Sequence, residues 1–593
     1  MVPVRMSRPL RVALFVGLGL ALLALVLPAV LTPWIADRVH AAARARGLEA
    51  EWRRLAFRWP LHVEIDALAV KRDTTTVLRA DRVRLDACPR GFTPHLSVTR
   101  LELEDAHLLL PESASDDERD DPSTDPEEES PTGAPAAPRV RAAAQQLADA
   151  LLLPARRLPT LYLNDVRVQR GDSLFARLDG LSLTHERDGV QFAATGALAG
   201  EQVMPFDVML QWHHDDRLMG RIAFDVPEAN GDRTSLPFLL DGRVTQDRHA
   251  GVLRIADDSR VTVGPVVLHV GGEVRRRGPR FACTLAVDSL TAANVQRHLP
   301  RAVLGPLADV PVAGRWDWRA SLVVDVSAPD STRFTADVIP HGLALAGSDA
   351  QLRLNRLAGP FVAEIHVPRG LVRRDLSDAN PHYRPLARIS PLLQHALLTN
   401  EDGSFYQHRG FNTGAIQSAM AANLRSGTFK RGAGTITMQL ARNLFLGHRR
   451  TLSRKGQEVV LAWMLEHMTG LGKDRLLEIY LNIIEWGPGV HGADEAARFY
   501  FDKDATDLTL DEALFLTVIV PSPSRWRSRV NPDGTLRPWA RAQMAYIARK
   551  MVSREWLAPE QVPTAEGLSI TLRGEAARAF APVDSTLTTD TVR

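Results

Sequence analysis

The chain has 593 residues and a mass of 65.3 kDa, roughly four domain lengths at about 150 residues each, so a single compact core is excluded. Apolar residues (45%) and charged residues (24%) have ordinary globular frequencies, which exclude wholesale disorder, a collagen-like repeat and a multi-span membrane protein. The formal charge of +2 is unevenly distributed: residues 111–130 hold ten acidic side chains and one arginine, a net −9, so the remainder carries +11. Two cysteines, Cys88 and Cys283, exclude a disulfide framework and a Cys-based zinc site and allow at most one disulfide.

The first predicted element is a transmembrane helix at residues 12–36, after a cytoplasmic segment at residues 1–11. Residues 12–36 contain no charged side chain, and a helix of that length exceeds the hydrocarbon thickness of about 30 Å. The apolar run is longer than that of a cleaved signal peptide, so we expect a permanent anchor; the alternative is cleavage near residues 41–43. Arginines on both sides leave the orientation open.

Residues 37–110 and 139–370 are predicted to be β-rich, because apolar and polar residues alternate, as in residues 61–65. The intervening residues 111–138 are rich in acidic residues, serine and proline. They cannot bury enough apolar surface to order themselves, so we expect a solvated, disordered loop.

The sequence of Ala67–Leu85 is loosely similar to that of Asp165–Leu183, which indicates a duplicated hairpin-like element. The anchor, the strand-rich meander and the basic character together resemble the periplasmic proteins of the AsmA type, whose curved sheets line a lipid-sized groove. A β-sandwich spacer without a ligand is the alternative for this region.

The apolar period becomes helical near residue 390, so residues 371–552 are predicted to form a mainly α domain, while residues 553–593 form a tail that the pattern does not interpret. A first helix ends near Asn400 and is followed by the adjacent carboxylates Glu401 and Asp402, in a loop that runs to Gly410. Such loops commonly hold catalytic groups, although an acidic pair alone is usually just solvated.

A second stretch, residues 432–443, is a glycine-rich turn that opens a helix. The free backbone N–H groups of such a turn attract an anion. Thr435, Gln439 and Arg442 are spaced to share one face of the helix. An ordinary helix cap with a polar outer face explains the threonine but not the whole polar row.

A third stretch places Arg454 and Lys455 four and three residues before Glu458, so that two cations flank one carboxylate on a helix. A surface ion-pair cluster is the simpler interpretation of this triplet alone. The fourth stretch, Lys473–Phe501, is a helix, a turn with the sequence Trp-Gly-Pro-Gly and another helix, and its apolar period predicts mainly scaffold.

In this order and spacing, the four stretches resemble the glycosyltransferase family (family 51, the transglycosylase domain of penicillin-binding proteins) that polymerises peptidoglycan from lipid II. The likeness covers about Pro385–Trp526, and the sequence at residues 485–489 is similar to that of monofunctional members. The resemblance implies a multidomain α+β chain that ends in a lysozyme-like, mainly α glycosyltransferase domain. Four positions depart from the family pattern, namely Asn412, Gly434, Met438 and Arg442.

The family resemblance implies an inverting transfer in which Glu401 is the general base and Glu458 the second catalytic carboxylate. Nearby Arg and Lys are expected to lower a carboxylate pKa, which favours transfer over hydrolysis. The candidate substrate-binding residues are Asp402, Phe405, His408, Thr435, Gln439, Arg442, Asn443, Arg450, Arg454 and Lys455. No residue is assigned to a protein-held metal site.

The expected partners are lipid II, the growing glycan strand, the membrane and cell-wall synthesis or envelope proteins, with no nucleic acid. A divalent cation (Mg²⁺ or Mn²⁺) at the diphosphate is allowed, and no organic cofactor is expected. Because lipid II is presented on the outer leaflet, the catalytic domain is expected in the periplasm, on a single-pass anchor in the inner membrane. Residues 411–429 are expected either to dip into the membrane or to form a buried helix. The competing function is an envelope lipid-binding or scaffolding protein with a secondary or inactive transglycosylase domain.

Overall fold

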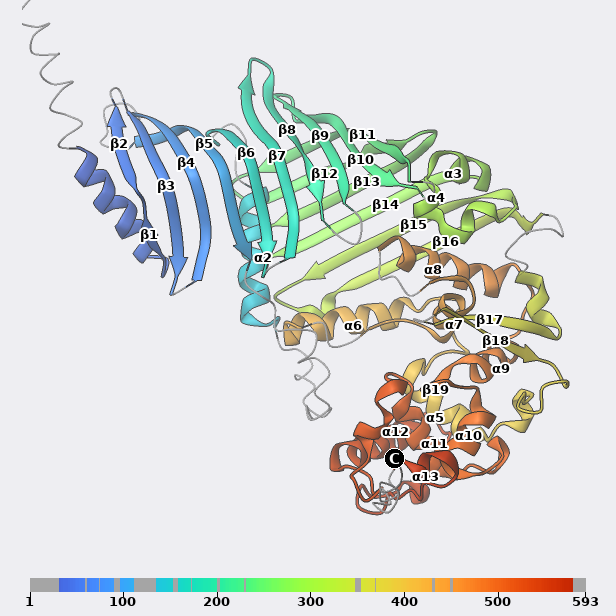
Figure 1. The fold of residues 1–593 in the computed structure, drawn as a ribbon. Coiled ribbons are helices and arrows are strands. Elements are labelled where there is room, and N and C mark those ends of the chain that lie inside the picture. The colour runs from blue at the N-terminus through green and yellow to red at the C-terminus, as the bar shows by residue number, and fades with distance from the viewer. Residues whose placement is uncertain are drawn as a thin grey trace, which may run out of the picture. The chain divides into compact units, whose positions relative to one another are not determined.

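The chain forms two compact units (Figure 1), one from residues 1–119 and 143–287 and the other from residues 120–142 and 288–593. The computed structural model describes residues 31–58, 61–73, 75–89, 96–110, 135–152, 158–171, 173–199, 203–228, 231–346, 354–367, 370–428, 432–447 and 452–579. A β-rich middle region and a mainly helical C-terminal region follow one another along the chain. This order agrees with the α+β class expected from the sequence.

Most of the predicted membrane span lies outside the described residues, which begin at residue 31. Residues 31–44 are helical, but no helix within the described part of the chain is long and apolar enough to cross a membrane. Residues 111–134 of the acidic segment also lie outside the described part. Cys88 and Cys283 are both free, so the disulfide that the sequence allowed does not form.

The first unit is built on one continuous sheet. Its strands are β1 (Glu49–Glu51), β2 (Arg54–Arg58), β3 (His62–Arg72), β4 (Thr75–Pro89), β5 (Leu96–Leu110), β6 (Thr160–Arg170), β7 (Ser173–Glu186), β8 (Gly189–Leu198), β9 (Met204–His213), β10 (Arg217–Pro227), β11 (Arg233–Asp247), β12 (Val252–Val263), β13 (Val266–Arg275) and β14 (Arg280–Leu290). From β3 to β14 they lie side by side in chain order, with β1 and β2 both paired to β3. The β-sandwich alternative is therefore wrong for this unit.

The pair β5 and β6 is parallel, whereas the other pairs from β1 to β14 are antiparallel. A parallel pair needs a crossover connection, and the chain supplies one through the acidic segment and α2 (Pro138–Leu151). The end of α2 is fixed to the sheet of the first unit, because Arg276 pairs with Asp149 at 2.6 Å and Gln246 Nε2 donates to the carbonyl of Leu152.

The duplicated hairpin predicted from the sequence corresponds to the pairs β3–β4 and β6–β7. Ala67 and Asp165, the first residues of the two copies, both have positive φ, at 53° and 50°. A positive φ is uncommon for any residue other than glycine, so the same interruption at the same position supports a true duplication. Asp105 in β5 also has a positive φ, at 48°, so β3, β5 and β6 each depart from regular extended geometry at one residue.

One face of this sheet is apolar across its whole width. Directly paired residues share a face, and a row of paired apolar side chains runs across neighbouring strands. The row consists of Ile65, Val83, Leu103, Leu163, Leu181, Ala194, Val208, Ile222 and Phe238, and the next positions continue it through Leu240, Val261, Leu268 and Val287. On the opposite face of the sheet, Arg84 of β4 forms ion pairs with Glu102 and Glu104 of β5.

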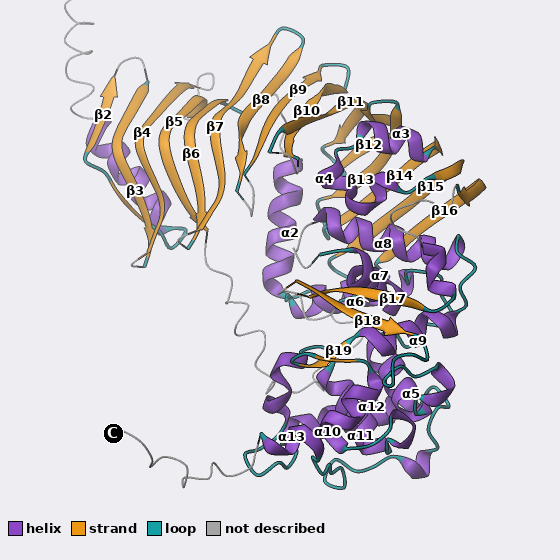
Figure 2. Ribbon diagram, turned by 45° about the vertical axis from the view of Figure 1, so that its right-hand side comes forward, coloured by secondary structure: helices purple, strands orange, loops and turns teal. Residues whose placement is uncertain are grey.

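In the second unit, short helices and the strands β15 to β18 come before a mainly helical region (Figure 2). Its main elements are α3 (Ala292–His298), α4 (Arg301–Leu304), η3 (Gly305–Asp309), β15 (Val312–Asp325), η4 (Pro329–Ser331), β16 (Arg333–Leu345), η5 (Leu354–Ala358), β17 (Phe361–Val367), β18 (Gly370–Leu376), α5 (Pro391–Glu401), α6 (Thr413–Ser426), α7 (Ile436–Phe445), α8 (Leu452–His467), α9 (Lys473–Ile483), β19 (Glu485–Gly487), β20 (Val490–His491), α10 (Ala493–Phe501), α11 (Leu510–Ile519), α12 (Pro538–Val552) and α13 (Gly574–Arg578). The helix predicted to end near Asn400 is α5.

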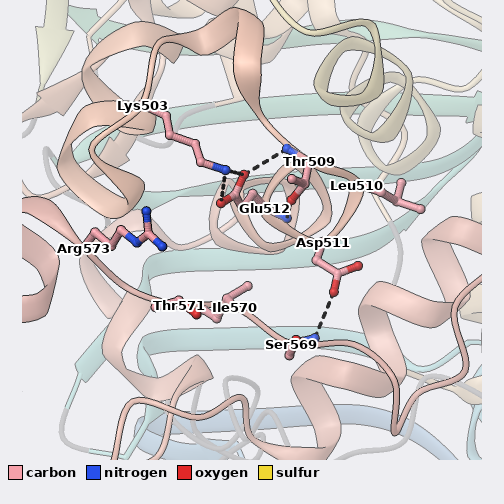
Figure 3. Close-up of a pocket in the computed structure, with 9 residues that line it drawn as sticks. All are labelled: Lys503, Thr509, Leu510, Asp511, Glu512, Ser569, Ile570, Thr571 and Arg573. Atoms are coloured by element: carbon pink, nitrogen blue, oxygen red, sulfur yellow. Dashed lines mark hydrogen bonds and ion pairs between the residues drawn. The ribbon is translucent and has the colours of Figure 1, made fainter.

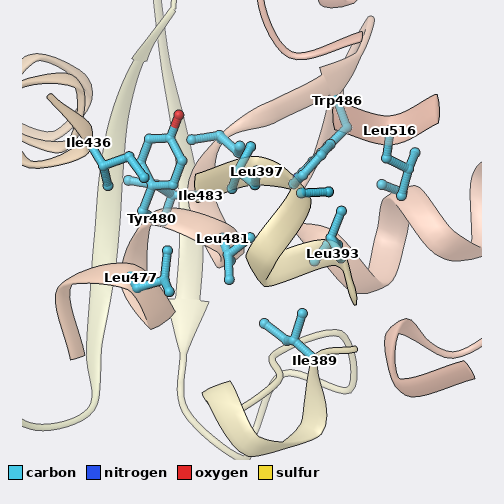
Figure 4. Close-up of a cluster of buried hydrophobic side chains, with 14 of the residues drawn as sticks. Ile389, Leu393, Leu397, Ile436, Leu477, Tyr480, Leu481, Ile483, Trp486 and Leu516 are labelled. Carbon is cyan, nitrogen blue, oxygen red and sulfur yellow. The ribbon is translucent and has the colours of Figure 1, made fainter. Parts of the chain in front are cut away.

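The core of this unit is a single apolar cluster around α5, α9 and α11, where Leu393, Leu397 and Leu481 are fully buried (Figure 4). Val310 and Leu357 belong to the same cluster, as do Leu568 and Ala576 beyond α12. Residues on both sides of positions 370 and 552 therefore share one core, and part of the C-terminal tail that the pattern left uninterpreted packs into it.

A fully buried carboxylate, Asp494 at the start of α10, joins three segments of this unit. Its oxygens lie 3.0 Å from His382 Nδ1, Arg384 Nη2 and Arg498 Nε. A buried charge is tolerated only when it is paired and hydrogen-bonded, and Asp494 also accepts from the backbone N–H of Ala505.

Replacing Asp494 by alanine is expected to lower the free energy of unfolding of the second unit by roughly 3 kcal/mol, because it removes a fully buried carboxylate that joins His382, Arg384 and Arg498. Urea unfolding and calorimetry would measure this. Glu364→Ala removes one partner of an exposed pair with Arg373 and is expected to change the melting temperature little. Equal effects of the two variants would contradict the assignment of Asp494 as a structural node.

Candidate active site

Glu401 ends α5 with its carboxylate turned into the protein. Gln439 Nε2, from α7, donates to Glu401 Oε2 at 2.8 Å, and Asn400 Nδ2 donates to Oε1 at 2.8 Å. Two neutral amides therefore satisfy the carboxylate, and Gln439 brings the first and second sequence stretches together. Asn400 is a contact that the sequence did not single out.

Burial raises the pKa of Glu401, and the repulsion of Asp402 adds to the rise. The hydrogen bonds from Gln439 and Asn400 and the charge of Arg442 act in the opposite direction without reversing it. The expectation that nearby cations lower the pKa is therefore wrong for this residue, because desolvation of the charged form outweighs the charge of Arg442. The pKa of Glu401 thus does not distinguish transfer from hydrolysis.

Tyr480, on α9, orients the amide that faces Glu401. Its hydroxyl donates to Gln439 Oε1 at 2.8 Å, which leaves the Nε2 end of the amide to face Glu401. Tyr480 is fully buried, and burial raises its pKa well above the usual value. The apolar period of this stretch predicts mainly scaffold. Tyr480 lies in the segment Tyr480–Asn482, whose likeness to a motif of the glycosyltransferase family was a further sequence signal for a functional role.

Asp402, His408 and Thr435 build the junction between the loop and α7. His408 Nε2 lies 2.9 Å from Asp402 Oδ1, while Asp402 Oδ2 accepts the N–H of Ile436 at 3.1 Å. Thr435 is the N-cap: its hydroxyl donates to the Gly410 carbonyl at 2.6 Å and accepts the Met438 N–H. Thr435 is therefore a buried cap, and it does not stand in an open polar row with Gln439 and Arg442 as the spacing suggested.

Phe405 packs into the core and carries a cation on its ring. The ring is 1% exposed, and Lys473 Nζ lies 4.2 Å from its centroid. Lys473 also pairs with the buried Glu466 at 2.8 Å, and burial lowers its pKa. Phe405 thus anchors the loop in the core. Lys473, which lies near the site, was not identified from the sequence.

The third stretch forms the ion pairs that its spacing predicted. In the first turns of α8, Arg454 Nε lies 3.2 Å from Glu458 Oε1 and Lys455 Nζ lies 2.8 Å from Oε2. Glu458 is 3% exposed, whereas the Lys455 side chain is 56% exposed. A buried carboxylate thus holds two cations, and one of them reaches solvent.

The cation cluster lies beside the glycine turn that opens α7. A Cβ added to Gly434 would lie 3.8 Å from Lys455 Nζ, so the turn and the cluster are neighbours. Gly434 is one of the departures from the family pattern, and a Cβ at this position would make an ordinary contact with Lys455. Farther along α7, Arg442 donates to Asn443 Oδ1 at 3.4 Å. The remaining candidate, Arg450, lies outside the described residues.

A protein-held metal site does not fit the residues present. Both oxygens of Glu458 are occupied by cations, and no group of three His, Cys, Asp or Glu side chains within the described ranges could hold a metal ion. Among the described residues, the divalent cation allowed at the diphosphate has no protein ligand set.

A separate pocket of about 450 Å³ lies where α11 begins, against the C-terminal segment (Figure 3). Lys503 and Glu512 form an ion pair on one wall, and Asp511 accepts the N–H of Ser569 on another. None of the candidate catalytic or substrate-binding residues lines it.

Comparison with known proteins identifies the helical region. The profile of the family described as "Transglycosylase" matches residues 370–552. The "Biosynthetic peptidoglycan transglycosylase" of Paraburkholderia xenovorans (strain LB400) is 40% identical over 171 residues, which are 68% of that protein and 29% of this chain. The chain belongs to the peptidoglycan transglycosylase family. It is a peptidoglycan glycosyltransferase of cell-wall biogenesis.

Two further relatives of this transglycosylase carry the same description. The protein of Laribacter hongkongensis (strain HLHK9) is 44% identical over 162 residues, 70% of its length and 27% of this chain. The protein of Neisseria gonorrhoeae (strain NCCP11945) is 47% identical over 139 residues, 59% of its length and 23% of this chain. These alignments span less than a third of the chain.

The raised pKa of Glu401 predicts a stability effect that depends on pH. A carboxyl group whose pKa is raised by folding stabilises the folded state fully below its unfolded pKa of about 4.3, and this contribution is lost as pH rises through the folded pKa. Glu401→Gln is therefore expected to melt above the wild type at pH 8, with a difference that shrinks toward pH 5. Calorimetry across this range would measure it.

The control for this effect is Glu466→Gln, which breaks a buried ion pair with Lys473 and is expected to lower the melting temperature. A Glu401→Gln protein that melts below the wild type at pH 8 would overturn the assignment.

Proposed function

We propose that this transglycosylase polymerises lipid II into glycan strands, with Glu401 as the general base. In this reaction the 4-hydroxyl oxygen of one disaccharide attacks the anomeric carbon of the growing glycan. The bond from that carbon to the undecaprenyl diphosphate breaks, and the configuration inverts. The single observation that carries the proposal is a partly buried carboxylate, Glu401, bonded to a helix that begins at a glycine turn next to Lys455.

The environment of Glu401 suits proton removal from a sugar hydroxyl. A hydroxyl is a poor nucleophile at neutral pH, so a carboxylate must take its proton, and it does so best when its pKa lies near the working pH. Burial raises the pKa of Glu401 in that direction. Gln439, held by Tyr480, fixes the carboxylate oxygen with a neutral donor.

The cations of the cluster would stabilise the negative charge that develops on the leaving group. As the glycosidic bond breaks, negative charge grows on the diphosphate, and preorganised cations lower the barrier. Lys455 and Arg454 would bind the diphosphate, and Glu458 would hold both cations at fixed distances. Arg442, which acts electrostatically on Glu401, extends the positive region along α7.

Lipid II polymerisation by the purified chain tests this proposal. Glu401→Gln is expected to lower the rate of glycan formation about 10²-fold or more, the usual cost of losing a general base, while the fold is retained. Glu364→Gln, at an exposed pair, is the control and should polymerise at the wild-type rate. Wild-type turnover in Glu401→Gln would exclude the base role, and shortened fragments from sacculi in place of polymer would indicate a hydrolase.

A lipid-linked substrate also fits the expected location. Residues 12–36 would anchor the chain in the inner membrane, with the enzyme in the periplasm where lipid II is presented. The apolar, uncharged character of these residues supports this arrangement.

A second function is favoured by the continuous apolar face of the first unit. The paired side chains on one face of this single-layered sheet are apolar from β3 to β14, which forms a continuous apolar row that a hydrocarbon chain could follow. We propose that this face binds the hydrocarbon chains of envelope lipids. The fluorescent fatty acid cis-parinaric acid is a suitable probe.

Val208 and Met209 offer a matched pair for this test, because they are neighbours on β9 that point to opposite faces. Val208 belongs to the apolar row, and Met209 is 52% exposed on the other face. Val208→Asp is expected to weaken fatty-acid binding about tenfold or more, since a charge would face the hydrocarbon, whereas Met209→Asp should bind as the wild type does. Equal binding by both folded variants would exclude this face as the lipid site.

A further inference from the structure

A short segment that precedes the family match holds the helix of the cation cluster. α4 and η3 lie beside α8 within the second unit (Figures 1 and 2). Gln457 Nε2, on α8, donates to the carbonyl of Val303 at 2.7 Å. Gln457 is only 8% exposed and directly precedes Glu458. The contact therefore acts on the part of α8 that carries the cluster.

Gly305 completes the seat for Gln457. Its φ is +54°, and an added Cβ would lie 2.8 Å from Gln457 Oε1 and 2.9 Å from Nε2. A side chain at this position would force the Gln457 amide to move and would also strain the backbone. Two backbone features of one segment, the Val303 carbonyl and the bare Gly305, thus fit a single side chain.

The segment is itself braced, so it can hold Gln457 firmly. Gln296 Nε2 donates to the carbonyls of Leu307 and Val310, at 2.9 and 2.8 Å. Arg301 pairs with Asp309 across the turn, and Val310 is 2% exposed in the main core of the unit. A support anchored in the core resists displacement more than a surface loop does.

Gln457 lies about 100° around the helix from Glu458, so the seat constrains rotation of α8 about its axis. Arg454 and Lys455 precede Glu458 by four and three residues, which is about one helical turn. All three side chains would shift together if α8 rotated. We propose that Gln457, seated on Val303 and Gly305, is a positioning residue for this cluster. This inference rests on the proposed role of the cluster in holding the diphosphate.

α4 and η3 lie before residues 370–552, the range matched by the transglycosylase family. The chain therefore uses residues outside that range to fix its leaving-group site. A misplacement of about 1 Å at a catalytic group can cost two orders of magnitude in rate, so such a support has kinetic consequences.

Steady-state kinetics with lipid II test the proposal in the full chain. Gln457→Leu and Gly305→Ala are each expected to lower kcat about tenfold with KM within twofold of the wild type, because the cluster acts mainly on charge that develops in the transition state. The matched control is Gln246→Leu, which removes a similar bond from a glutamine amide to a carbonyl in the first unit and should leave kcat unchanged. Gln457→Asn, too short to reach Val303, replaces the leucine variant if that variant fails to fold.

Hydrogen exchange of peptides from residues 452–460 gives a readout that does not need activity. Exchange there should be faster in Gln457→Leu than in the wild type, while peptides of α9 remain unchanged. An unchanged kcat in both variants, a rise in KM alone, or unchanged exchange would each overturn the positioning role. A wild-type chain that makes no polymer would refute the proposed function, and the exchange experiment would still test the contact.

Discussion

The start of α7 is the constraint on which the catalytic region depends. The first N–H groups of any helix lack partners within it, and here Asp402 accepts the N–H of Ile436 while Thr435 accepts that of Met438. Because Asp402 follows Glu401 directly, capping α7 also brings the end of α5 against it. One turn further along α7, Gln439 then meets the carboxylate of Glu401. A local requirement for hydrogen bonds thus fixes a long-range contact.

The two carboxylates assigned to catalysis have different surroundings, and their proposed roles follow from that difference. Glu401 is partly buried against neutral amides, and desolvation raises its pKa. Glu458 is buried, and each of its oxygens contacts a cation. The first environment favours gaining a proton, and the second favours holding positive charge in place. The same residue type therefore serves as a base in one position and as a support in the other.

Short-range spacing predicted the parts of the site that one helix can build alone. The cluster of Arg454, Lys455 and Glu458 formed as expected, because side chains three and four residues apart on a helix are neighbours whatever the tertiary fold. The strands were predicted in a similar way, because the alternation of apolar and polar residues is also a short-range pattern. The spacing also places Thr435 on a polar face with Gln439 and Arg442, whereas the structure shows the helix cap that the sequence offered as the alternative for this threonine.

Contacts that join distant segments could not be read from the sequence, and they decide the electrostatics. The link from Tyr480 through Gln439 to Glu401 joins three helices, and without it the balance between burial and Arg442 could not be judged. The seat of Gln457 on Val303 spans 154 positions. It depends on a carbonyl, which every residue has, and on a missing side chain at Gly305. Neither leaves a pattern in sequence, so a support of this kind becomes visible only when the fold brings its parts together.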